Sequence, residues 1–155
     1  MVRYFLDTEF NGFGGELLSL ALVREDGPSL YLVYEIPELV GRWVKTHVLP
    51  ALYAVPPEIE ALRVDQARGA EALGDFLKGD ALPEVFADWP DDVAYFCKAL
   101  MTGPGTMVPL RRMRFEMVRL DAYPLNLPGA SAHNAWWDAM ALRERVVRQP
   151  LLARA

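Results

Sequence analysis

Two carboxylates separated by one residue, Asp7 and Glu9, stand in the segment FLDTEF near the N-terminus. In an extended chain, residues two positions apart point to the same side, so both carboxylates are expected on one face. Two anions on one face repel each other, and a divalent cation between them would make the pairing tolerable. The alternative is that Asp7 only caps a turn at the end of its strand.

A second acidic group, Asp88, Asp91 and Asp92, lies in the segment VFADWPDDVAYF. It follows a short apolar run and precedes a helical pattern. Aspartate is common as an N-cap and complements the helix dipole in the first turn, so capping alone could account for two of the three. The third is then available for other chemistry.

His133 and Asp138 are five positions apart in HNAWWDAMAL. At about 100° per residue they do not share a helical stripe, so His133 is expected at the helix start or on the preceding loop, with Asp138 one turn inside. An imidazole would then stand near a fixed carboxylate, where it could act as a general base. A histidine with a purely structural role is the alternative.

In order and spacing, the segments FLDTEF, DWPDDVAYF and HNAWWDA resemble the three motifs of the DEDDh group of 3′-to-5′ exonucleases, which have a ribonuclease H-like fold. The similarity runs from about Val2 to about Val147. GRWVKTHVLP and GGELLSLALV are similar to a small stand-alone bacterial branch whose members act as exoribonucleases. The second motif departs from the family, which commonly has an amide or His-Asn pair and an aromatic where this chain has DWPD.

The resemblance implies roles for particular residues. Asp92 is taken as the second-motif ligand because Tyr95 and Phe96 follow it where the family has bulky apolar residues, with Asp91 as the close competitor. Two Mg²⁺ or Mn²⁺ ions would be held by Asp7, Glu9, Asp92 and Asp138, with Asp7 as the bridge, and His133 would be the general base. Implied substrate contacts are Thr8, Phe10, Asn11, Asp88 and Trp89.

The function implied is hydrolysis of single-stranded RNA or short oligonucleotides from the 3′ end to nucleoside 5′-monophosphates. Single-stranded DNA is an alternative substrate. An alternative function is that of a catalytically silent member of the same fold, which would bind nucleic acid or a partner protein. The acidic residues argue against nucleic-acid binding alone, because clustered negative charges repel a polyanion. A phosphatase using Asp7 as nucleophile would lack a clear lysine partner. The relatives by resemblance are often homodimers.

The elements expected to position these residues form a mixed α/β layout. Strands are predicted for residues 2–6, 17–23, 30–36 and 84–87, and for 113–122 with one exposed face. Helices are predicted for 38–48, 64–77, 91–100 and 131–148, the last ended by Pro150. Residues 54–64 are expected to form a loop or short helix, and 102–110 an irregular connection rich in Gly and Pro.

Length and composition favour one globular domain over residues 1–155, with a ribonuclease H-like central sheet of three antiparallel strands and further strands, flanked by helices. Apolar residues make up 52% of the chain, yet no run is long enough for a membrane span, and a single cysteine favours the cytoplasm. The net charge of −5 argues against binding nucleic acid by bulk charge, but two divalent ions would reverse the field locally. The arginines of RRMRFEMVR could steer a nucleic-acid strand or be solvated surface charge.

Overall fold

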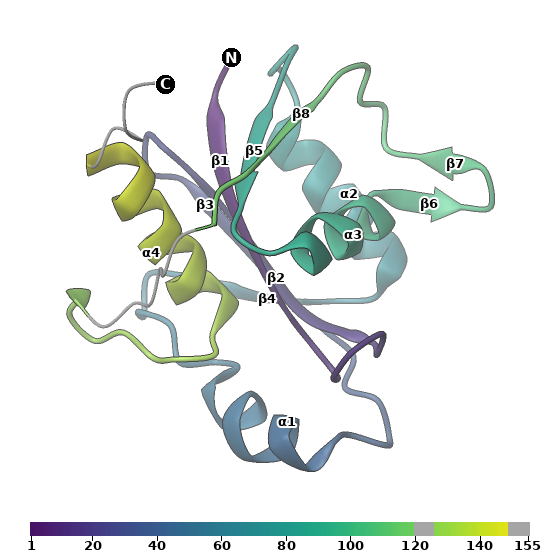
Figure 1. Cartoon of the computed structure of the whole chain (residues 1–155). Coiled ribbons are helices and arrows are strands. Elements are labelled where there is room, and N and C mark those ends of the chain that lie inside the picture. Colours follow the sequence, from purple (N-terminus) through teal and green to yellow (C-terminus); the bar gives the residue numbers. More distant parts are fainter. Residues whose placement is uncertain (120–125, 149–155) are drawn as a thin grey trace.

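A six-stranded sheet with the order β4-β3-β2-β1-β5-β8 forms the centre of the molecule in the computed structural model, which describes residues 1–119 and 126–148 (Figure 1). β1 pairs with β2 and β2 with β3 in antiparallel register, whereas β3–β4, β1–β5 and β5–β8 are parallel. The expected ribonuclease H-like mixed sheet, with three antiparallel strands first, is confirmed. The strands are β1 Arg3–Phe10, β2 Leu17–Arg24, β3 Ser29–Tyr34, β4 Ala61–Val64, β5 Glu84–Ala87 and β8 Arg114–Met117.

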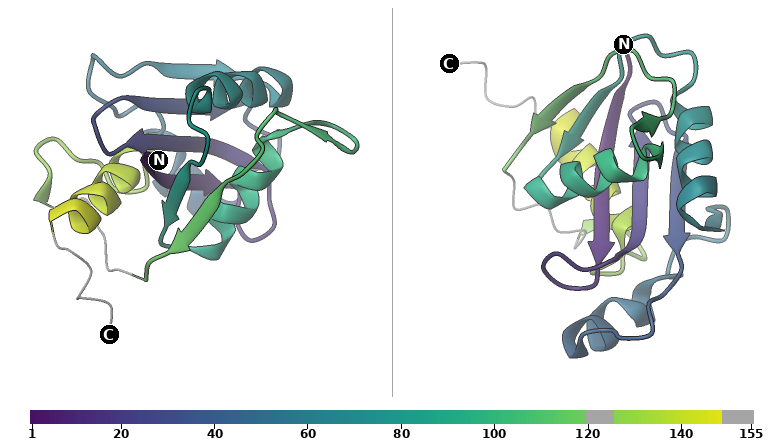
Figure 2. Two further views of the ribbon diagram at one scale, coloured as in Figure 1. Left: turned by 90° about the horizontal axis from the view of Figure 1, so that it is seen from above. Right: turned by 90° about the vertical axis from the view of Figure 1, so that its right-hand side faces the viewer.

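Helices cover both faces of this sheet. α4 (Ala135–Arg148) packs on one face, and α2 (Gln66–Leu77) and α3 (Pro90–Ala99) pack on the other (Figures 1 and 2). The short helix α1 (Arg42–His47) and the 3₁₀ turn η1 (Leu49–Ala51) lie beyond one end of the strands, as Figure 2 shows. Among the described residues, no helix combines the length and apolar character that crossing a bilayer requires.

The alternation of side chains along β1 determines which face of the sheet carries Asp7 and Glu9. Tyr4 and Leu6 belong to the core beneath α2 and α3, whereas Phe5 belongs to the core beneath α4. Because successive side chains of a strand point to opposite faces, Asp7 and Glu9 continue the Phe5 face and point to the α4 side. The strand does not stop at residue 6 as expected, so both carboxylates lie within β1.

Two short β-elements differ from the sequence prediction. Ala61–Val64 forms β4 at the sheet edge, where a loop or short helix is expected, because four backbone partners on β3 extend it. Residues of the Gly- and Pro-rich connection form a two-stranded hairpin, β6 (Met101–Gly103) and β7 (Thr106–Met107), around Gly105, whose φ of 69° suits glycine. Neither run is long or apolar enough to be recognised by periodicity.

Helix starts also move relative to the sequence prediction. α1 begins at Arg42 rather than at residue 38, and α2 begins at Gln66 because the Asp65 carboxylate accepts from the Arg68 N–H at 2.8 Å. α4 begins at Ala135 rather than at Ser131. Residues 120–122 of the strand predicted for 113–122, and Pro150, lie outside the described residues.

Candidate active site

The first acidic pair, Asp7 and Glu9, is half-buried on the central strand. β1 is paired on both sides, with β2 and with β5, so its backbone is held along its length. Asp7 Oδ2 is buried and has no hydrogen-bond partner among the described residues. An unpartnered buried carboxylate oxygen costs free energy unless a cation or a proton compensates it.

The second acidic group comes from the junction between β5 and α3. Asp92 is 3% exposed, and its Oδ1 accepts two hydrogen bonds from Thr8, one from the backbone N–H at 3.0 Å and one from Oγ1–H at 2.6 Å. These bonds hold the carboxylate against β1. Asp91 turns elsewhere, and its Oδ2 accepts from Trp89 Nε1–H at 3.1 Å. Of the two competing residues, Asp92 therefore joins the carboxylates of β1.

The last carboxylate, Asp138, is fixed by the cap of α4. Asn134 is fully buried, and its Oδ1 accepts from the backbone N–H groups of Trp136 at 3.0 Å and Trp137 at 3.2 Å. Its Nδ2 donates to the Ala51 carbonyl at 2.8 Å, which ties the helix start to η1. This capping sets where α4 begins, and Asp138 lies in its first turn.

Five carboxylates from three segments meet around Asp7. One oxygen each from Asp7, Glu9 and Asp138 lie within 4.8 Å of one another, and so do oxygens from Asp7, Asp88 and Asp92. The two triads share Asp7. Asp88 thus lies in the carboxylate cluster itself, whereas the sequence suggests only a substrate contact for it.

Burial and mutual repulsion raise the pKa values of these groups. Burial, followed by the charges of Asp92 and Asp138, raises the pKa of Asp7 well above its usual value. Burial and the charge of Asp138 raise the pKa of Glu9 to about 8. The pKa values of Asp92 and Asp138 both rise to about 7, again mainly through burial, although the Thr8 hydrogen bonds oppose the rise at Asp92. Protons or cations must therefore compensate this cluster near neutral pH.

The donor set of the cluster fits hard divalent cations. All of its side chains offer carboxylate oxygens, which Mg²⁺ and Mn²⁺ prefer. The unpartnered Asp7 Oδ2 is an oxygen that such a cation would satisfy.

His133 lies on the loop before α4, with a left-handed φ of 57°. Its ring packs edge-on against Trp43 of α1, with 4.9 Å between the ring centroids, and lies 6.0 Å from the ring of His47. Partial burial and the nearby His47 lower the pKa of His133, which favours the neutral imidazole. The contacts of His133 with α1 are not foreseeable from the sequence, because they depend on where the loop and α1 meet.

Two curated proteins similar to this chain are both named 3′-5′ exoribonuclease, one from Mycobacterium tuberculosis strain H37Rv and the other from strain CDC 1551 / Oshkosh. Each is 37% identical to the chain over 120 residues, which cover 74% of this chain and 69% of the relative. The chain belongs to their exoribonuclease family. No protein-family model matches it. The prediction from the sequence that the chain is an exoribonuclease relative is thereby confirmed.

Most of the other residues predicted to contact the substrate make contacts within the protein. Thr8 is buried and bonds Asp92, and the Phe10 ring stacks on Tyr95 of α3 with 4.6 Å between centroids. Asn11 Oδ1 accepts from the Gly41 N–H at 2.9 Å and so fixes the entry to α1. Trp89 is 47% exposed.

Asn134, which fixes the start of α4, is not among the residues predicted from the sequence. The available signal was an Asn directly before the apolar run AWW, a common N-cap position. Its bonds to Ala51 and to Tyr31 Oη, the latter at 3.3 Å, join segments more than 80 positions apart. No local pattern reveals these two bonds.

Proposed function

We propose that this chain is a metal-dependent 3′-to-5′ exoribonuclease of the DEDDh type. It would shorten single-stranded RNA or short oligonucleotides from the 3′ end and release nucleoside 5′-monophosphates. The observation that carries the proposal is the convergence of Asp7, Glu9, Asp92 and Asp138 into one partly buried cluster in a chain of the exoribonuclease family. A surface salt-bridge network would not bury an unpartnered carboxylate oxygen.

Two Mg²⁺ or Mn²⁺ ions would be held by the two triads, with Asp7 common to both and Asp88 a member of the second. When bound, such ions would lower the pKa of a water molecule and stabilise negative charge on the leaving 3′ oxygen. Thr8 fixes the orientation of the Asp92 carboxylate through two hydrogen bonds, as outer partners of metal ligands do. Asn134 does the same for Asp138 through the start of α4.

His133 would accept the proton of the attacking water as general base. Its lowered pKa supports this role, since a base must be deprotonated at the working pH. Its position on a loop immediately before the helix that carries Asp138 also supports it. Such proton transfer contributes about 10²–10⁴-fold to a rate.

The test is incubation of the protein with 5′-end-labelled single-stranded RNA and DNA, with Mg²⁺, with Mn²⁺ and with a chelator. We expect stepwise 3′ shortening of RNA that the chelator abolishes. Asp7→Asn and Glu9→Gln should abolish it as well. Shortening of DNA alone would reassign the substrate, and retarded migration without cleavage would indicate a silent binding module. Mass measurement in solution tests the homodimer that the resemblance implies.

A further inference from the structure

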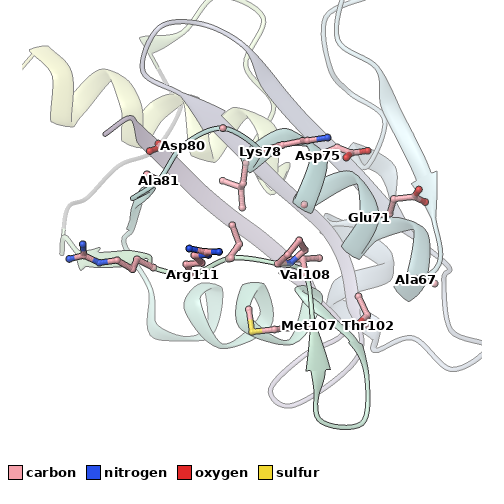
Figure 3. A pocket seen from close by; sticks show the side chains of 16 residues that line it. Ala67, Glu71, Asp75, Lys78, Asp80, Ala81, Thr102, Met107, Val108 and Arg111 are labelled. Atoms are coloured by element: carbon pink, nitrogen blue, oxygen red, sulfur yellow. The ribbon is translucent and has the colours of Figure 1, made fainter.

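The structure separates the arginines that follow one another along the chain. Arg111 and Arg112 line a cavity of about 860 Å³ beside α2, together with the α2 residues Glu71 and Asp75 (Figure 3). α2 covers the face of the sheet opposite to α4. These two arginines therefore lie away from the carboxylates that point to α4, and they do not serve the acidic cluster.

Arg119 has a different position, which the pairing of β5 with β8 determines. Ala87 pairs with Met117 in parallel register, and the Val118 N–H donates to the Ala87 carbonyl at 2.8 Å. Two residues further along each segment stand Trp89 and Arg119. The Arg119 guanidinium carbon lies 4.6 Å from the centre of the Trp89 ring, a cation–π contact.

The Trp89 side chain is oriented although it is half exposed. Its Nε1–H donates to the Asp91 carboxylate at 3.1 Å, and Asp91 is fixed in the first turn of α3. The indole is 47% exposed. A fixed, exposed aromatic face is a surface on which any base can stack.

This pair adjoins the acidic cluster. Trp89 directly follows Asp88, whose carboxylate belongs to the triad with Asp7 and Asp92. Burial raises the pKa of Asp88, and the positive charge of Arg119 opposes that rise. Arg119 is exposed and forms no ion pair within residues 1–119 and 126–148, so its charge is available to another anion.

We propose that Trp89 and Arg119 bind the single strand just 5′ of the scissile phosphate, with a base stacked on Trp89 and a phosphate bound by Arg119. The inference rests on the proposed exonuclease function and adds where the strand runs. A strand whose 3′ end lies at the carboxylates must leave past a neighbouring surface. The β5–α3 junction offers an aromatic ring and a cation there.

The experiment measures kcat and KM on single-stranded oligoadenylate in Mn²⁺, over roughly 50 to 200 mM salt. Arg119→Gln should raise KM with little change in kcat, and should reduce the slope of log KM against log salt by about 0.7, the value of one single-strand phosphate contact. Trp89→Leu should raise KM roughly tenfold, and Trp89→Phe should largely restore it, because a stacked base is worth a factor of that order.

Arg112→Gln is the matched control, since it removes an arginine from the cavity beside α2 and should keep the wild-type KM and salt slope. An Arg119→Gln variant with the wild-type salt slope would overturn the proposal. So would a loss of kcat and melting temperature at constant KM, because Arg119 would then only offset the charge of Asp88. Failure of the wild-type protein to shorten RNA would instead refute the proposed function.

Discussion

Thr8 donates both its backbone N–H and its Oγ1–H to the same carboxylate oxygen of Asp92, across 84 positions of sequence. Asp92 is buried, so these bonds, which stabilise the ionised form, work against the burial that raises its pKa to about 7. A residue between two candidate metal ligands thus positions a third. This relationship fixes the second-motif carboxylate against the central strand.

Thr8→Val should weaken metal binding without removing any ligand. Valine keeps the volume and the backbone N–H but lacks the hydroxyl donor, and loss of such an outer partner typically costs about 10–100-fold in metal affinity or activity. Mn²⁺ titration by calorimetry measures the affinity. Thr102→Val is the control, because its hydroxyl donates to Thr106 Oγ1 on the exposed β6–β7 hairpin. Equal Mn²⁺ affinity in the Thr8 and Thr102 variants would contradict the role given to Thr8.

The two neighbouring aspartates of α3 should differ sharply when neutralised. Asp92→Asn removes a carboxylate from the cluster and should reduce the Mn²⁺-dependent rate by at least about 10²-fold, as loss of a ligand implies. Asp91→Asn should retain Mn²⁺ affinity, since its side chain faces Trp89. Rates and Mn²⁺ titrations of both variants make the comparison. The reverse order would show that Asp91 is the ligand.

Stability of the metal-free protein should fall as pH rises. The carboxyl groups titrate near pH 4 in an unfolded chain, whereas the folded pKa is about 8 for Glu9 and about 7 for Asp92 and Asp138. Between these values the folded state holds more protons, so the free energy of unfolding declines with rising pH. The stabilisation is complete below about pH 4 and is lost by about pH 8.

Urea denaturation in chelator at several pH values measures this decline. Saturating Mn²⁺ should raise stability most at the alkaline end, where protons no longer neutralise the cluster. Glu9→Gln, which removes one of the titrating groups, should flatten the metal-free profile. A profile that rises with pH in chelator would show that the carboxylates are not held together in solution.

His133→Ala should separate catalysis from metal binding. His133 is not among the clustered carboxylates, so Mn²⁺ affinity should be kept while the rate falls by about 10²–10⁴-fold. His47→Gln tests the environment of the base. Because His47 contributes to the lowered pKa of His133, the acid limb of kcat/KM should move to higher pH in that variant. An unchanged rate in His133→Ala would remove this residue from the mechanism.

Asn134→Ala should destabilise the fold, since it removes the cap of α4 and a buried bond to Ala51. Loss of an N-cap costs about 0.5–2 kcal/mol. Loss of the bond to the Ala51 carbonyl, which keeps its bond from the Ala54 N–H, adds about 0.5–1.5 kcal/mol. Asn134→Asp keeps the capping acceptor and loses the donor, so chemical denaturation of both variants separates the two parts. Equal losses in the two variants would show that the cap contributes nothing.

The sequence alone was sufficient to predict the mixed sheet and its first three strands, because their apolar runs are interrupted by clear turn residues. It was also sufficient to place Asp7 and Glu9 on one face, since a strand alternates its side chains strictly. The short strand β4 and the β6–β7 hairpin escaped prediction. Their pairing partners, rather than their own composition, make them extended.

Tertiary structure decided what local spacing cannot express. Asp91 and Asp92 are adjacent in the chain, and only the contact with Thr8 directs Asp92 to the cluster. Likewise, only the register of β5 with β8 separates Arg119 from Arg112, although seven positions divide them in one basic stretch. Spacing along a chain sets which side chains share a face of one element. Which faces meet depends on packing between distant segments, and that packing concentrates the charge on which the proposed chemistry depends.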